Sequence, residues 1–135
     1  MAHLDPLFVG NSTGGPGIGG GIYNGGGTVT IAETMLARNG GDSGAALGNG
    51  VSELGSSTVR GTVLLTNSTL VDNIEFGFGG FLNGGTAILI NTTIARSGTS
   101  GALINGGTVI LTNSTLADNP DGGLVNGNVA GSGGL

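Results

Sequence analysis

Short apolar segments that open with threonine recur along the chain between glycine-rich and asparagine-rich stretches. The clearest are TVLLT (62–66), TAILI (86–90) and TVILT (108–112), and TVTIA (28–32) has the same form. A short run of aliphatic and β-branched residues bounded by turn residues predicts a β-strand, in which successive side chains point alternately to the interior and to the outside. A second apolar-centred segment follows each of them, as in NSTLVDN (67–73) and NSTLADN (113–119). The pattern therefore predicts many short strands joined by tight turns.

A third block completes an internal repeat. It reads GGIYNGG (20–26), GGFLNGG (79–85), GALINGG (101–107) and GGLVNG (122–127), with a weaker copy, GAALGNG, at 44–50. The threonines that open the apolar segments, Thr28, Thr62, Thr86 and Thr108, are separated by 34, 24 and 22 residues. We interpret residues 51–60, inside the long first step, as a loop extruded from one corner. A repeat of this size fits three short strands and three turns, which is one coil of a parallel β-helix.

The predicted fold is all-β: a single-stranded parallel β-helix, or solenoid, with three short strands per rung. We expect about four full rungs plus half-rungs at both ends. Residues 1–19 are assigned to an N-terminal half-rung and tail, residues 20–127 to the solenoid repeats, and residues 128–135 to a glycine-rich C-terminal tail.

Stacked rungs should place similar side chains in continuous files through the interior. Three such files are predicted, each filled by aliphatic residues. They are Val29, Val63, Ala87 and Val109; Ile31, Leu65, Leu89 and Leu111; and Leu36, Leu70, Ile94 and Leu116.

Two asparagine columns accompany these files, and we expect at least one of them to be a buried amide ladder. Asn67, Asn91 and Asn113 continue the inward register of the strand that opens with threonine, and the other column ends the first strand of each coil with Asn24, Asn83, Asn105 and Asn126. Asn11, Asn67, Asn91 and Asn113 also begin N-x-[ST] sequons, which mark acceptors for N-linked glycans. We favour the inward placement, which leaves no room for a sugar. If the chain turns outward one residue earlier, glycans can attach.

Charges are sparse and argue against several functions. The net charge is −5 with three basic residues, so no basic stripe is present for nucleic acid, and the apolar runs are too short to span a bilayer. Arg38, Asp72, Arg96 and Asp118 fall in one column of alternating sign, which we interpret as a solvated charge ladder rather than a catalytic site. We therefore predict no enzyme activity, no metal and no cofactor. Ice binding ranks lower, because the column beside the threonine row is mostly apolar.

At this point a resemblance can be stated on the segments GGGIYN, GGTVTI and NSTLADN. Over roughly residues 18–127 the chain resembles the glycine-rich right-handed β-helix repeats of bacterial surface proteins. These include the polymorphic outer-membrane-protein type and the passengers of adhesin-like autotransporters. The resemblance implies a right-handed coil and an extracellular or cell-surface location. The chain departs from that family in its short length and in lacking a membrane anchor or translocator segment.

The two ends read as incomplete coils. Asn11-Ser12-Thr13 matches the register of Asn67-Ser68-Thr69, and residues 122–135 supply the first strand of a further rung. We therefore expect a structural protein whose partner is itself, stacked head to tail into a fibre through Phe8, Val9, Leu124 and Val125, with glycans as a further partner. The alternatives are a fragment of a larger surface adhesin and, behind it, a carbohydrate-active β-helix enzyme.

Overall fold

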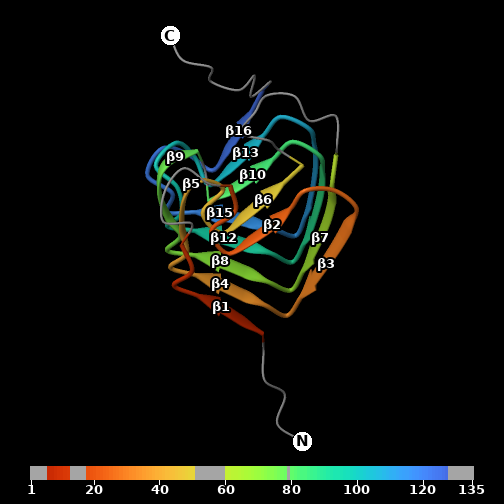
Figure 1. Ribbon diagram of the computed structural model, residues 1–135, viewed down its shortest axis with the longest axis horizontal. Helices are drawn as coiled ribbons and strands as arrows, with labels where there is room; N and C mark the ends of the chain where they lie inside the picture. Colours follow the sequence, from red (N-terminus) through yellow and green to blue (C-terminus); the bar gives the residue numbers. More distant parts are fainter. Residues whose placement is uncertain (1–5, 13–17, 51–59, 79, 128–135) are drawn as a thin grey trace, which may run out of the picture.

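The protein is a β-solenoid in which parallel strands stack in coils (Figure 1). The computed structural model describes residues 6–12, 18–50, 60–78 and 80–127, and for residues 42, 43 and 74–78 it describes the backbone alone. Within these ranges all regular structure is β-strand. Three strands form each coil, and the coils repeat about four times, which confirms the predicted fold class.

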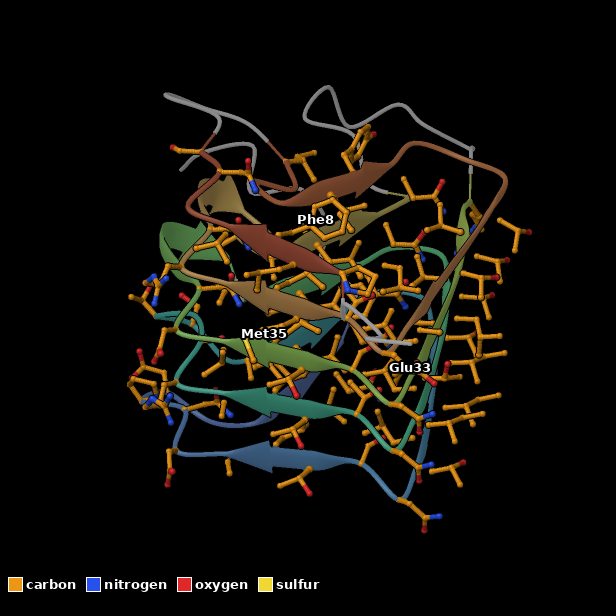
Figure 2. The ribbon with its side chains drawn as sticks, turned by 90° about the horizontal axis from the view of Figure 1, so that it is seen from below. Phe8, Glu33 and Met35 are labelled. Atoms are coloured by element: carbon orange, nitrogen blue, oxygen red, sulfur yellow. The ribbon has the colours of Figure 1, made fainter. Side chains whose placement is uncertain are left out.

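The strands of successive coils form three parallel sheets. Sheet 1 contains β2 (Ile22–Asn24), β6 (Leu47–Asn49), β10 (Phe81–Asn83), β13 (Leu103–Asn105) and β16 (Leu124–Asn126). Sheet 2 contains β3 (Thr28–Ala32), β7 (Thr62–Thr66), β11 (Thr86–Ile90) and β14 (Thr108–Thr112). Sheet 3 contains β1 (Leu7–Val9), β4 (Met35–Ala37), β8 (Thr69–Val71), β12 (Thr93–Ala95) and β15 (Thr115–Ala117). Figure 2 shows the strands of sheet 3 stacked along the axis.

The predicted interior files are confirmed by the strand register. In sheet 2, Val63 pairs with both Val29 and Ala87, and Leu65 pairs with both Ile31 and Leu89. In sheet 3, Leu70 lies between Leu36 and Ile94. Burial follows the same alternation, since Val63, Leu65, Leu70, Ala87 and Leu89 are fully buried. The core is therefore a bundle of apolar files parallel to the axis, and each rung shields the next from water.

A short fourth sheet at the corner between sheets 3 and 1 was not predicted. β5 (Gly40–Ser43) pairs in parallel with β9 (Ile74–Phe78), with an irregularity in register between Gly41 and Ser43. The first two full coils therefore carry an additional strand at this corner. The predicted loop lies between β6 and β7, and of its residues 51–60 all but Arg60 fall outside the described residues.

The predicted inward position of Asn67, Asn91 and Asn113 is wrong. All three are exposed and adopt left-handed backbone conformations, with φ of 50°, 52° and 48°. Asparagine tolerates this region better than most residues, so it suits a one-residue corner between sheets 2 and 3. The corner interrupts the alternation and turns the following residue inward, and Ser68 and Thr92 are accordingly buried. Glu33 occupies the same corner of the first coil with φ of 51° (Figure 2).

The predicted register of the N-terminal half-rung is also wrong. β1 pairs with β4 so that Phe8 lies opposite Leu36, and the backbone of Ser12 bridges to Gly40. Asn11 therefore aligns with Asn39 rather than with Asn67. The apolar triplet LFV determines this pairing, because it places Phe8 at the end of the Leu36, Leu70 and Ile94 file.

Candidate functional site

A ladder of hydrogen-bonded asparagines, most of them buried, lies at the end of sheet 1. The side-chain amide of Asn49 donates to Asn83 Oδ1 at 2.7 Å, and that of Asn83 donates to Asn105 Oδ1 at 2.7 Å. The same bond joins Asn24 to Asn49 at 3.0 Å and Asn105 to Asn126 at 2.8 Å. Every amide points toward the C-terminal end, so the ladder has a direction.

The ladder also closes the glycine-rich corner between sheets 1 and 2. Asn83 Nδ2 donates to the carbonyl of Thr108 in the next coil, and Asn83 Oδ1 accepts from the backbone N–H of Gly85. Asn49 repeats this pattern by donating to the carbonyls of Gly61 and Thr86. Each amide therefore binds backbone groups of the corner in addition to the next asparagine of the ladder.

Four of the five asparagines of this ladder were predicted from the sequence. Asn24, Asn83, Asn105 and Asn126 were expected at these positions, whereas Asn49 was missed because its segment was treated as a weak copy of the repeat. The structure places Asn49 fully buried between Asn24 and Asn83, in register with both. The signal that identifies it is a large apolar residue two positions before an Asn-Gly pair, which LGNG (47–50) shares with FLNG (81–84) and LING (103–106).

A second inward polar column follows sheet 3 and was not predicted. It contains Asn11, Asn39, Asn73, Ser97 and Asn119, and its central members Asn39, Asn73 and Ser97 are at most 1% exposed. Asn39 donates through Nδ2 to Asn73 Oδ1 at 3.0 Å, and Asn11 does the same to Asn39. The pairs RN, DN, RS and DN that end the third segment of each coil carry this signal.

The outward asparagine column presents its sequons to solvent. Asn91 Nδ2 donates to Asn67 Oδ1 at 3.1 Å, and this bond is exposed. Asn11, the fourth sequon asparagine, is exposed as well. Asn67, Asn91 and Asn113, which we expected in the interior, therefore form one column on the surface.

The predicted charge column forms at the other left-handed corner, after the strands of sheet 3. Its four residues have left-handed backbone, with φ of 52° at Arg38, 53° at Asp72, 47° at Arg96 and 54° at Asp118. Arg96 binds Asp72 through two bonds, Nε to Oδ1 at 2.7 Å and Nη2 to Oδ2 at 3.1 Å. The hydrogen bonds from Arg96 lower the pKa of the Asp72 carboxyl, and Arg38 adds a smaller effect in the same direction.

Replacing Asp72 with asparagine should lower stability at neutral pH and have little effect in acid. Because the pKa of Asp72 is lowered in the folded state, its contribution is present above the unfolded value of about 3.9 and is lost as pH falls through the folded value. Thermal unfolding of Asp72→Asn and wild type should therefore differ at pH 7, and the difference should disappear as pH falls from about 3.9 through the lower folded pKa. Asp118→Asn, which removes a carboxylate from the same column, serves as control. A difference that persists in acid would contradict the ion-pair origin.

Exposed large apolar side chains gather at the two ends of the solenoid. Of the side chains that the structure describes, four are on β1, β2 and β4: Leu7, Phe8, Tyr23 and Met35. Four more are on β14 and β16: Ile110, Leu111, Leu124 and Val125. Phe8 is 39% exposed, Leu124 42% and Val125 43%, whereas the matching residues of the central coils are buried. Figure 2 shows Phe8 and Met35 near the N-terminal end.

Among the described residues, no helix is long and apolar enough to cross a membrane, and no three or more His, Cys, Asp or Glu side chains are close enough to hold a metal ion. Comparisons with models of known families, with curated proteins and with solved structures found no match.

Proposed function

We propose that the protein is a structural subunit that stacks head to tail into an extracellular fibre and acts through assembly rather than catalysis. The observation that carries this proposal is the location of the exposed large apolar side chains at the two ends. Contiguous exposed apolar surface marks a site of association. A contact between two different ends does not close on itself, so it generates a filament.

The strand edges support the same arrangement. At the N-terminal end, β1 has one described partner, β4, and at the C-terminal end β15 and β16 each have one described partner, β12 and β13. Unpaired edges are templates for a further strand. In a head-to-tail stack, β1 of one copy pairs with β15 of the preceding copy in sheet 3, and β2 pairs with β16 in sheet 1.

Sheet 2 has no described strand that could complete the coil at such a joint. Sheets 1 and 3 each contain five strands, whereas sheet 2 contains four. The half-rungs of two copies therefore supply two of the three strands of the joining coil from the described residues. Residues 128–135, which follow β16 in the chain, lie outside those residues.

Electron microscopy of the purified protein across a concentration series tests the proposal. We expect unbranched filaments of one width above a critical concentration. Leu124→Asp, which places a carboxylate at the end of an interior file, should raise that concentration about hundredfold or more, because the charge becomes buried in the stack. Thr112→Asp adds the same charge to the outward face of β14 and serves as control. Uniform single particles of wild type at high concentration would overturn the proposal.

The exposed sequons support a second proposal, that glycans are attached to Asn67, Asn91 or Asn113 on the corner between sheets 2 and 3. Exposure of all three acceptors is the supporting observation. The intact mass of protein secreted from a glycosylating host, before and after glycosidase treatment, tests it. An unmodified mass would overturn it.

A further inference from the structure

The second polar column links each coil to the next through a bond that recurs at every rung. The backbone N–H of Asn39 donates to Asn73 Oδ1 at 3.0 Å, and that of Asn73 donates to Ser97 Oγ at 3.3 Å. Asn11 N–H and Ser97 N–H make the equivalent bonds to Asn39 Oδ1 and Asn119 Oδ1, each at 3.0 Å. In all four steps the N-terminal coil provides the N–H and the C-terminal coil provides the side-chain oxygen.

Three asparagines of the column also make a second hydrogen bond to the preceding coil, in which the side-chain amide donates to a backbone carbonyl. Asn39 Nδ2 donates to the carbonyl of Phe8 at 3.0 Å, and Asn73 Nδ2 donates to that of Leu36 at 2.9 Å. Asn119 Nδ2 donates in the same way to the carbonyl of Ile94 at 3.2 Å. In each case the carbonyl belongs to the interior-facing residue of the preceding strand of sheet 3. The carboxamide thus binds the preceding coil through both its oxygen and its nitrogen.

We call this pair of hydrogen bonds, made by one carboxamide to the preceding coil, the clamp. Each end of the molecule carries one half of it. At the C-terminal end, the described residues provide neither a side-chain oxygen for Asn119 N–H nor a carboxamide for the carbonyl of Leu116. At the N-terminal end, the exposed Asn11 donates one amide hydrogen to Asn39 Oδ1. An amide nitrogen carries two hydrogens, and among the residues that the structure describes the second hydrogen and Oδ1 of Asn11 have no partner, so both can bind a preceding coil.

We propose that Asn11 of one copy clamps the C-terminal end of another, with Oδ1 accepting from Asn119 N–H and Nδ2 donating to the Leu116 carbonyl. The inference rests on the proposed head-to-tail stack and specifies its contact. It aligns β1 with β15 so that Phe8 continues the file that ends at Leu116. It also gives the fibre a direction. In a stack of two N-terminal ends, the Asn11 carboxamides would meet without the strand groups that complete the clamp.

Substitution of Asn11 tests the clamp in the full-length chain. Asn11→Ala removes both joint bonds and should raise the critical concentration for filament formation about tenfold, which corresponds to about 1.4 kcal/mol. Asn11→Ser restores an acceptor of the kind that Ser97 provides, so its critical concentration should lie between those of Asn11→Ala and wild type. Circular dichroism and thermal unfolding below the critical concentration should show that both variants fold.

The outcomes separate this inference from the proposal beneath it. If wild type forms no filaments, the head-to-tail stack itself is overturned, and the clamp with it. If wild type forms filaments and Asn11→Ala assembles at the same concentration, the stack stands and the clamp is overturned. A helical reconstruction with all subunits in one direction would support the clamp, and one with alternating directions would overturn it.

Discussion

Asn83→Ala should destabilise the protein by about 4 kcal/mol, because it removes a fully buried link from the middle of the amide ladder. The substitution takes away the acceptor of the Asn49 amide and the donor to Asn105 Oδ1. It also removes the side-chain partners of Gly85 N–H and the Thr108 carbonyl, and a buried group without a partner costs about 1–3 kcal/mol. Chemical denaturation at concentrations below those that favour assembly measures the change.

Asn126→Ala is the matched control, because Asn126 ends the same ladder and is exposed. It removes one bond, from the Asn105 amide, and that amide also donates to the carbonyl of Gly107. The expected loss is therefore below about 1 kcal/mol. If both variants lost the same free energy of unfolding, burial of the hydrogen bonds would not explain the contribution of Asn83.

Position in the stack adds to the difference between these variants. In a solenoid, stability is close to a sum of rung stabilities and contacts between neighbouring rungs. Asn83 lies on β10, which has two described strands of sheet 1 on either side, whereas Asn126 lies on β16, the last described strand. Asn83→Ala therefore weakens contacts between the two halves of the solenoid, whereas Asn126→Ala loosens only its C-terminal end.

The interior files were predictable because their signal is local and repeated. Residues 62–66, 86–90 and 108–112 are short apolar runs that open with threonine; in a strand every second side chain faces inward, and the common spacing determines which of them stack. Neither step requires knowledge of distant contacts. The same regularity explains why the asparagines at the ends of β2, β10 and β13 were assigned to one column.

The corners were predicted less well, because one residue in a left-handed conformation reverses the alternation without changing the spacing. Asn67 sits two residues after Leu65 and would face inward in a continuous strand, but φ of 50° turns it to solvent and brings Ser68 inside. The repeat keeps its period under either reading, so period alone cannot decide between them. The preference of asparagine and aspartate for left-handed backbone was the available clue.

The candidate site shows the same division. The ladder of Asn24, Asn83, Asn105 and Asn126 follows from strand periodicity, and the structure adds Asn49. The clamp column could not be read from periodicity, because Asn39 and Asn73 follow a left-handed corner and Asn11 was aligned with another column. The apolar ends were predicted in part: Phe8, Val9, Leu124 and Val125 lie on the two end strands β1 and β16. The prediction did not include the other exposed apolar residues at the ends, which are Leu7, Tyr23, Met35, Ile110 and Leu111.

Gly85→Ala should destabilise the protein by about 3 kcal/mol, through contact between neighbouring coils rather than loss of a bond partner. A Cβ at Gly85 would clash with the carbonyl oxygen of Gly61 and lie 3.0 Å from the Gly61 nitrogen. These are backbone atoms of the adjacent coil, held by the bond from Thr86 N–H to the Gly61 carbonyl at 2.9 Å. The coils would have to separate beyond the spacing of about 4.8 Å that parallel strands maintain.

Gly127→Ala provides the control at the equivalent corner of the last described coil. A Cβ there meets no atom of the described residues within 4 Å, so the change in stability should stay within about 0.5 kcal/mol. Denaturation midpoints of the two variants, measured below the concentration for assembly, give the comparison. If Gly85→Ala were as stable as Gly127→Ala, the corner would be more pliable than its contacts indicate. The glycine before each strand of sheet 2 would then reflect turn conformation alone, and the close approach of the coils would not explain it.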